Sequence, residues 1–293
     1  MARVGWATQQ GPSGPRGRRA AALAVALAFL LVVAAILLPA AKVFGSTPPP
    51  MGKADPKAAA VAQALTSAMG GQEAWERLPY VRFDFVVMKD GKEAVRFRHW
   101  WDKKNGRDRV EGPDDKGRIV TAIVHLSDRK GKSFTTGVPD ADSAHVQMGY
   151  ERWVNDSYWF MMPFKLRDPG TRLKYSGRKK GAAGAEWDVL ELTFDPGVGL
   201  TPKDHYWLYV NTKTHLLDRW DYLLQDMKGS PKSATWEGWT QVGPVRLSTL
   251  HSFEGQPVAL RFENVSAPAT MDESVFTEGH LRETPLLPNT RRR

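Results

Sequence analysis

The sequence predicts a mainly β domain of the α+β class: a curved antiparallel sheet partly covered by helices, preceded by one N-terminal hydrophobic helix. Three observations lead to this prediction. Apolar residues alternate with polar ones at a period of two from residue 80 onward. Turns that contain glycine recur between these segments, as in an antiparallel meander. One aromatic-rich stretch, residues 141–170, lacks this period and interrupts the strands.

The first expected element is an uncharged apolar run at residues 20–41, which follows several arginines. The 19 residues before Pro39 would span roughly 28 Å as a helix, close to the thickness of a bilayer core. Two interpretations stay open, an uncleaved inner-membrane anchor and a signal peptide that is cut near residues 43–45. Both send the rest of the chain to the periplasmic side, because positive residues stay in the cytoplasm.

The chain is therefore expected to fall into five parts. They are a basic cytoplasmic n-region (1–19), a transmembrane anchor or signal peptide (20–41), a Pro-rich linker (42–54), a β domain (55–285) and a basic tail (286–293).

Two helices are expected at the start of the β domain. Asp55-Pro56 is typical of a helix start, with the Asp side chain as cap and Pro at the first helical position. Apolar residues follow at helical spacing until Gly70-Gly71, where the helix should end. A short second helix is expected at residues 72–78, before Pro79.

About a dozen strands should follow from Tyr80, with a hairpin turn at Asp90-Gly91. Phe83 and Phe85 are expected on one face of the sheet, and Arg82 and Asp84 on the other. The later strands are predicted at residues 171–176, 185–194, 204–211, 215–225, 233–241, 245–253 and 257–265. Between the two groups of strands, residues 141–170 are predicted to form one or two helices and a loop, with residues 141–162 as the lid.

The charge distribution argues against a nucleic-acid partner. The net charge is +9, but residues 1–55 contribute +5 and the three terminal arginines +3, which leaves +1 for residues 56–290. A folded domain so close to neutrality lacks the basic patch that phosphate binding requires. The chain also contains no cysteine, so it uses no disulfide in an oxidising compartment.

No catalytic, metal-binding or cofactor-binding motif stands out. Gly131-Lys132-Ser133 ends like a phosphate-binding loop, but Leu126 occupies the position of the first required glycine. There is no G-x-S-x-G elbow and no H-E-x-x-H pair. His99, His205 and His251 lie within strand patterns and are expected to be structural. We therefore expect no catalytic residue, no metal and no cofactor.

Four segments of the domain have a distinctive composition and order. They are residues 70–83 (GGQEAW, then a strand that begins YVRF), 155–170 (NDSYW, MPFKL and DPG), 209–214 (YVNTKT) and 242–247 (VGPVRL, with Phe276 later). In this order the four segments resemble the LolA/LolB-like group of outer-membrane lipoprotein-sorting proteins. The resemblance extends over residues 56–285. The order and the spacing carry the resemblance, since no single segment is specific.

The resemblance implies an unclosed β-barrel around an apolar cavity, with helices as a lid, which binds acyl chains or other hydrophobic ligands and performs no chemistry. The chain departs from the family at its N-terminus. The sorting carrier is soluble after signal cleavage, and its acceptor is anchored through a lipidated cysteine. Because this chain has no cysteine, the lipid-anchored form is excluded, whereas a freely diffusing carrier and a tethered binder both stay open.

A curved sheet with alternating faces would line a ligand cavity with its inward residues, and the lid would cover it. Large, adaptable side chains suit a flexible acyl chain, although each of them would equally suit a plain core. The expected ligand-binding residues are Phe83, Phe85, Phe97, Trp101 and Trp207 of the strands, and Trp153, Trp159, Phe160, Met161 and Met162 of the lid.

The function expected from the sequence is thus a monomeric envelope protein that binds a lipid or an acylated protein, in lipoprotein sorting or lipid transport. It would contact the inner membrane through its N-terminal helix, or move freely in the periplasm after cleavage. Two alternatives remain, a regulatory or interaction module of the same fold and, as a third, an envelope hydrolase.

Overall fold

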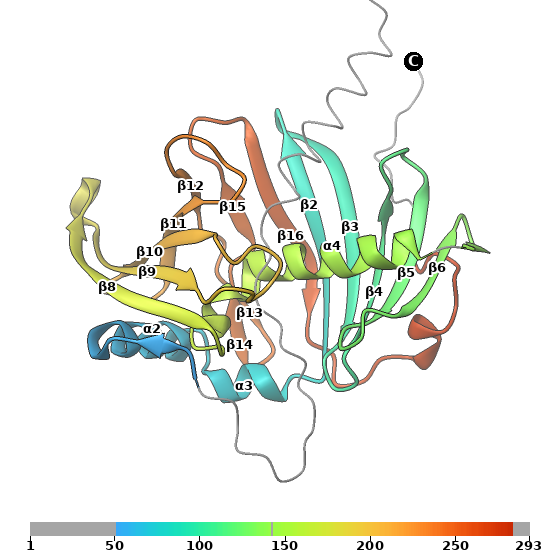
Figure 1. The fold of residues 1–293 in the computed structure, drawn as a ribbon, viewed down its shortest axis with the longest axis horizontal. Coiled ribbons are helices and arrows are strands. Elements are labelled where there is room, and N and C mark those ends of the chain that lie inside the picture. The colour runs from blue at the N-terminus through green and yellow to red at the C-terminus, as the bar shows by residue number, and fades with distance from the viewer. Residues whose placement is uncertain (1–50, 142, 284–293) are drawn as a thin grey trace, which may run out of the picture.

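The computed structural model describes residues 51–141 and 143–283 (Figure 1). The expected N-terminal hydrophobic helix, most of the Pro-rich linker and the basic tail lie outside the described residues. Within the described ranges, no helix is both long enough and apolar enough to cross a membrane.

The two expected opening helices are present as α2 (Pro56–Ala68) and α3 (Gln72–Arg77). The Asp55 side chain caps α2 by accepting a hydrogen bond of 2.7 Å from the backbone N–H of Ala58. Gly70 follows α2 with a φ of +104°, and a Cβ at this residue would lie 2.4 Å from the Pro244 carbonyl oxygen. Glycine is therefore required here by both the backbone angle and the close approach.

Two sheets carry most of the chain. In spatial order, the eight-stranded sheet contains β15 (Leu250–Ser252), β16 (Val258–Ser266), β2 (Tyr80–Lys89), β3 (Lys92–Asp102), β4 (Arg107–Pro113), β5 (Ile119–His125), β6 (Gly131–Thr135) and β7 (Val138–Pro139). The six-stranded sheet contains β1 (Lys53–Ala54), β8 (Thr171–Lys180), β9 (Glu186–Phe194), β10 (His205–Asn211), β11 (Leu217–Leu223) and β12 (Lys232–Thr235). A small hairpin consists of β13 (Thr240–Val242) and β14 (Val245–Leu247).

The two large sheets meet where β12 approaches β15. Antiparallel bridges join Ala234 to Phe253 and Glu237 to Leu250 at this meeting point. At the far ends, β1 pairs with β8 and β7 pairs with β6, and no pairing between β1 and β7 closes the described part of the chain into a barrel. The prediction of a curved, mainly antiparallel and unclosed sheet is confirmed. The exception is β1, which pairs in parallel with β8 inside the stretch expected as a linker.

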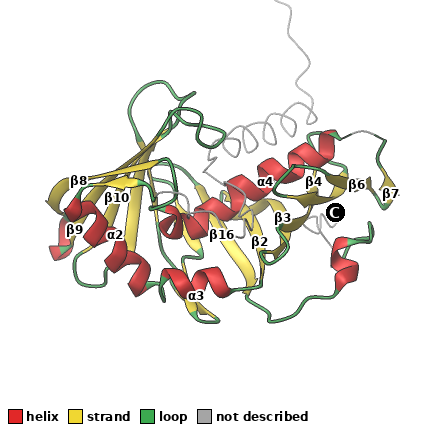
Figure 2. Ribbon diagram, turned by 60° about the horizontal axis from the view of Figure 1, so that its bottom comes forward, coloured by secondary structure: helices red, strands yellow, loops and turns green. Residues whose placement is uncertain are grey.

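The predicted helical interruption is present as one long helix, α4 (Ala144–Met161), followed by a 3₁₀ turn at Met162–Lys165. Figures 1 and 2 show α4 running across the strands on one face of the eight-stranded sheet. Gly149 permits its close contact with β4 and β5, because a Cβ there would lie 2.7 Å from the Cβ of Ala122. The position of α4 agrees with the predicted lid.

Two predicted strands are wrong in their extent. Residues 233–241 and 245–253 were each expected as one strand, but they form the four short strands β12, β13, β14 and β15. Gly238, with a φ of +63°, turns the chain between β12 and β13, so the strand cannot continue there. Two further 3₁₀ turns lie at Ala182–Gly184 and Glu273–Phe276.

Candidate functional site

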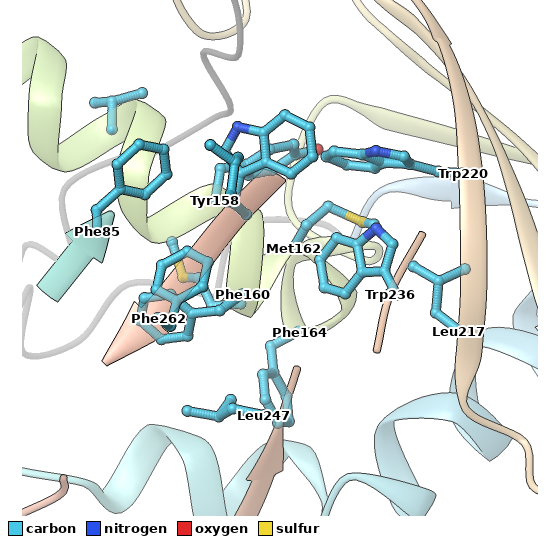
Figure 3. Close-up of a cluster of buried hydrophobic side chains, with 14 of the residues drawn as sticks. Phe85, Tyr158, Phe160, Met162, Phe164, Leu217, Trp220, Trp236, Leu247 and Phe262 are labelled. Atoms are coloured by element: carbon cyan, nitrogen blue, oxygen red, sulfur yellow. The ribbon is translucent and has the colours of Figure 1, made fainter. Parts of the chain in front are cut away.

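The inner face of the curved sheet and α4 enclose a set of large side chains that we call the inner aromatic cluster (Figure 3). All its members belong to one contiguous core and are at most 6% exposed. They are Trp75, Phe83, Phe85, Phe97, Trp101, Trp153, Trp159, Phe160, Met161, Met162, Trp220, Trp236 and Phe262.

Edge-to-face ring contacts connect α4 to the strands below it. The ring centroid of Phe160 lies 4.7 Å from that of Phe83 on β2 and 5.0 Å from that of Phe262 on β16. Nearer the start of α4, Trp153 lies 5.3 Å from Trp101 on β3. These contacts between rings are apolar and stabilise the buried arrangement of α4 on the sheet. Unlike hydrogen bonds, they do not require one fixed geometry.

The structure brings nine of the ten predicted ligand-binding residues into the inner aromatic cluster and leaves Trp207 outside it. Trp207 is only partly buried and stacks on His205, with ring centroids 3.9 Å apart. Side chains alternate along β10, so the buried Tyr206 and Leu208 face the interior and Trp207 faces away. Trp207 therefore lies outside the interior that the other nine residues line.

Sequence reasoning missed Trp220 and Trp236, which pack at the end of the interior nearest β11 and β12. Trp220 lies 4.7 Å from Trp159 of α4 and 5.2 Å from Trp236, measured between ring centroids. The alternation of Trp220 and Tyr222 along the predicted strand 215–225 was a usable signal for the first of them. Trp236 lies beyond the end of β12, where no alternation remains.

Three buried indole groups of the cluster have no hydrogen-bond partner. They are the Nε1 atoms of Trp153, Trp220 and Trp236, each without an acceptor in the part of the chain that the structure describes. An indole N–H can only donate, and leaving such a donor buried and unpaired costs about 1–3 kcal/mol. The interior therefore offers hydrogen-bond donors that the described chain does not use.

One polar network crosses the otherwise apolar interface between α4 and the sheet. His99 of β3 is fully buried, with Nδ1 2.9 Å from Asp108 Oδ2 and Nε2 3.0 Å from Asp156 Oδ2. Arg152 donates to the same Asp156 carboxylate, and Asn155 adds a hydrogen bond of 2.8 Å. Both ring nitrogens of His99 are thus paired, as expected for a structural histidine, and the network ties α4 to β3 and β4.

Burial and pairing act in opposite directions in this network. Burial raises the pKa of Asp108 to about 6, against the effect of the neighbouring His99. Burial alone would lower the pKa of His99, but the charge of Asp108 and the hydrogen bonds to Asp108 and Asp156 outweigh it and raise this pKa. Asp108 Oδ1 has no partner among the described residues, which agrees with a carboxyl group that readily keeps its proton.

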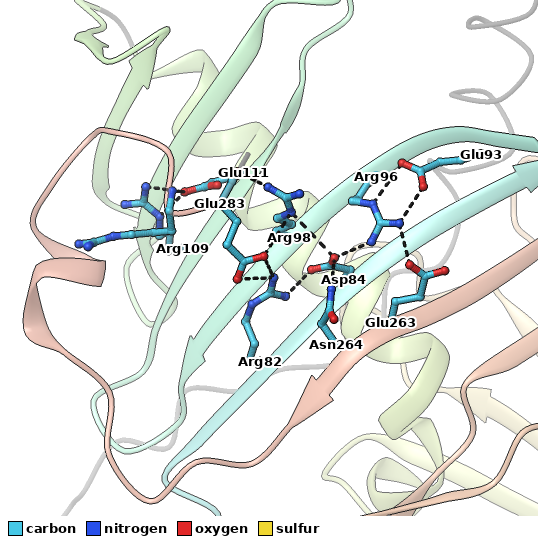
Figure 4. Close-up of polar contacts among 11 residues, drawn as sticks. Arg82, Asp84, Glu93, Arg96, Arg98, Arg109, Glu111, Glu263, Asn264 and Glu283 are labelled. Atoms are coloured by element: carbon cyan, nitrogen blue, oxygen red, sulfur yellow. Dashed lines mark hydrogen bonds and ion pairs between the residues drawn. The ribbon is translucent and has the colours of Figure 1, made fainter. Parts of the chain in front are cut away.

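The opposite face of the same strands carries a second cluster, the outer charged cluster, shown in Figure 4. At its centre, the Asp84 carboxylate is fully buried, forms an ion pair with Arg82 and accepts hydrogen bonds of 2.6 Å from Arg96 and 3.0 Å from Asn264. Arg96 also pairs with Glu263 on β16 at 2.7 Å. The full cluster comprises Arg82, Asp84, Glu93, Arg96, Arg98, Arg109, Glu111, Glu263, Asn264 and Glu283.

The C-terminal segment, residues 272–283, covers part of this outer face. Arg109 has no exposed surface, donates to Glu111 at 2.8 Å, and donates through Nη1 to the Val275 carbonyl oxygen at 3.0 Å. It also donates to the carbonyl oxygens of Glu278 and His280. The expectation that the outward residues of these strands would be polar is met, but they are buried rather than solvated.

The described residues provide little for catalysis. Across residues 51–141 and 143–283, no group of three or more His, Cys, Asp or Glu side chains is placed to hold a metal ion. His99 lies between two carboxylates, as a catalytic base often does, yet neither it nor its partners have exposed surface through which a substrate would reach them. The arrangement is suited to holding α4 in place.

Comparisons with known proteins give one family model and a set of solved structures. The model of a family of unknown function (DUF6503) matches residues 113–236. The search of curated proteins found no match.

Among solved structures, the chain is similar to a LolA superfamily protein from Nitrosomonas europaea, with 11% identity and a TM-score of 0.43, over 75% of this chain and 97% of that one. A domain assigned to an outer membrane lipoprotein-sorting protein of Vibrio parahaemolyticus is 11% identical, with a TM-score of 0.40, over 75% of this chain and 96% of that one. The MucA/MucB complex from Pseudomonas aeruginosa gives 17% identity and a TM-score of 0.24, over 73% of this chain and 59% of that one. These three structures are at most 17% identical to the chain, with TM-scores of at most 0.43.

Proposed function

We propose that this chain binds a hydrophobic ligand, a lipid or the acyl chain of an acylated protein, between α4 and the inner face of the sheet. The observation that carries the proposal is the composition of this interior, which combines large aromatic and Met side chains with unpaired indole donors. Met161 and Met162, at the end of α4, are flexible enough to adapt to a bound chain.

The competing interpretation is a plain core with no ligand. A plain core also collects aromatic residues, but it usually pairs its buried polar groups. Three unpaired indole N–H groups lie in this one interior, and a ligand with acceptor atoms would pair them. The proposal therefore depends on the donors as well as on the apolar surface.

We further propose that the protein acts by binding in the bacterial envelope and catalyses no reaction. The apolar run at residues 20–41 supports export, with the β domain on the periplasmic side of the inner membrane, either tethered or released after cleavage. The full burial of His99 and its carboxylate partners supports a role without chemistry. Lipoprotein sorting and lipid transport are the processes that such a monomeric binder would serve.

Native mass spectrometry of the full chain after mild extraction tests this function. We expect the wild type to carry lipid, and a Phe160→Ala variant to lose most of it because Phe160 joins α4 to β2 and β16. The matched control is Trp207→Ala, which removes an aromatic ring on the outward side of β10. A wild type that carries no lipid under conditions that preserve lipid in a known lipid-binding protein would contradict the proposal.

A second candidate function is an interaction module that docks an extended peptide. The observation that favours it is the outer charged cluster, which already binds residues 272–283 through the main-chain oxygens that accept from Arg109. Pull-down from envelope extracts with the wild type and Phe160→Ala separates the two. Loss of lipid with full retention of a partner would show that the two activities are distinct.

A further inference from the structure

We propose that Trp220 and Trp236 form a hydrogen-bonding site for the carbonyl group of an acyl chain, so that the ligand is an acyl ester or amide and not a bare hydrocarbon or an alkyl ether. This inference rests on the proposed function and names the chemical class of ligand for the same interior.

The two donors lie close together and are completely enclosed. Trp220 is 0% exposed and Trp236 is 1% exposed, and their ring centroids are 5.2 Å apart at an interplanar angle of 81°. Both Nε1 atoms lack an acceptor in the described part of the chain. A carbonyl oxygen has two lone pairs, so it can accept hydrogen bonds from two N–H groups at once.

The surroundings favour a neutral acceptor over an anionic head group. Tyr206 stacks on Trp220 at 5.0 Å and donates a hydrogen bond of 2.9 Å to the buried Asp204 carboxylate, so a negative charge already lies behind this ring. His251 lies 4.7 Å from Trp236, and burial lowers its pKa to about 4, so it adds no positive charge at neutral pH. Burying a second anion here would carry a large desolvation cost, whereas a carbonyl group would not.

The groups that cover the pair belong to the lid side of the molecule. Trp159 of α4 lies 4.7 Å from Trp220, and Figure 3 shows the side chain of Met162 pointing toward the ring of Trp236. An unbranched thioether side chain changes rotamer at little cost. Movement of Met162 would therefore give a carbonyl group access to both donors while the acyl chain lies along the aromatic rings.

Two lysophosphatidylcholines that differ in one group test the inference. One carries a palmitoyl ester and the other a hexadecyl ether, so head group and chain length are matched and only the carbonyl oxygen differs. The full chain is placed in nanodiscs of dialkyl ether phosphatidylcholine, whose lipids have no carbonyl group. Binding of each radiolabelled probe is measured on immobilised protein, with empty nanodiscs subtracted.

We expect the wild type to bind the ester roughly tenfold more tightly than the ether, as for one or two net hydrogen bonds. Trp220→Phe and Trp236→Phe should each reduce this preference to about twofold or less, because they remove the N–H and keep an aromatic ring. Trp207→Phe, the matched control on the outward side of β10, should keep it.

Equal binding of ester and ether by the wild type would overturn the inference and leave the proposed function standing. Binding of neither probe would overturn both. A preference that survives in both Trp→Phe variants, with wild-type thermal unfolding, would place the carbonyl group elsewhere and overturn the assignment to Trp220 and Trp236. The comparison of the two probes on the wild type does not depend on the folding of any variant.

Discussion

The two faces of β2, β3 and β4 are built from the same strands but held together by different physics. On the inner face, rings such as Phe83 and Phe85 are held by buried apolar area and dispersion contacts. Such contacts tolerate a small shift of the side chains that pack against them. On the outer face, Asp84 and Arg109 are fixed by ion pairs and hydrogen bonds of defined direction. In our proposal, the outer face holds the scaffold and the inner face accommodates the ligand.

The largest expected effect comes from breaking the outer face at Arg109. Arg109→Met should lower the free energy of unfolding by about 3–5 kcal/mol, because the buried Glu111 carboxylate loses its charged partner and keeps only the backbone N–H of Arg282, and three carbonyl oxygens of residues 275–280 lose a donor. Urea-induced unfolding of the full chain measures this change.

The double variant Arg109→Met/Glu111→Met separates an unpaired charge from lost packing. Removing both charges should recover most of the loss, since a buried ion pair replaced by apolar groups is often neutral. Arg261→Met, at an exposed position of β16, is the control and should change little. A loss at Arg109 that the double variant does not recover would show that the main-chain contacts to the C-terminal segment dominate.

The polar network of the inner face should make stability depend on pH. The pKa of Asp108 is about 6 in the folded protein against an ordinary 3.8. A raised carboxyl pKa means that its stabilising contribution is complete below pH 3.8 and is lost as the pH rises through 6. The raised pKa of His99 acts in the same direction at higher pH, because the fold loses stability when His99 loses its proton.

Asp108→Asn imitates the protonated carboxyl group and isolates this contribution. The stability of the wild type relative to Asp108→Asn should fall by about 3 kcal/mol between roughly pH 3 and pH 8, and most of the fall should lie between the two pKa values. Unfolding curves at a series of pH values measure it. Parallel pH profiles for the two proteins would contradict the role assigned to Asp108.

The smallest of these effects concerns the contact between α4 and the sheet. Gly149→Ala places a Cβ 2.7 Å from the Cβ of Ala122, so α4 must move away from β5, at a cost of about 1–3 kcal/mol. Gln147→Ala, at an exposed position of the same helix, is the control. If the inner face adapts as proposed, Gly149→Ala should keep lipid binding. A variant that is as stable as the wild type would show that the helix does not press on the sheet there.

Local patterns predicted the parts of the fold that depend on near neighbours in the sequence. The Asp55 cap, the Gly70-Gly71 stop and the Asp90-Gly91 turn act within a few residues, and the helices and hairpin around them are confirmed. The helical interruption followed from the change of period at residues 141–170, whereas the unclosed sheet followed from the family resemblance. These features depend on patterns within short segments of the sequence.

The outer charged cluster and part of the site were not predictable in this way. Arg109 and Val275 are 166 residues apart in the sequence, and nothing near either one indicates that the C-terminal segment covers the sheet. Alternation along a strand separates two faces but does not say which is inside, so Trp207 was assigned to the wrong one. Trp236 falls inside the stretch 233–241 that was expected as one strand, although β12 ends at Thr235.

The central claim, that the ligand lies between α4 and the inner face of the sheet, is tested most directly by photo-crosslinking. A palmitoyl lysophosphatidylcholine with a diazirine at the end of its acyl chain is bound to the full chain and irradiated, and the modified residues are mapped by mass spectrometry. We predict crosslinks to the inner aromatic cluster, above all to Trp159, Phe160 and Phe262. Crosslinks confined to exposed residues such as Val138 would contradict the account.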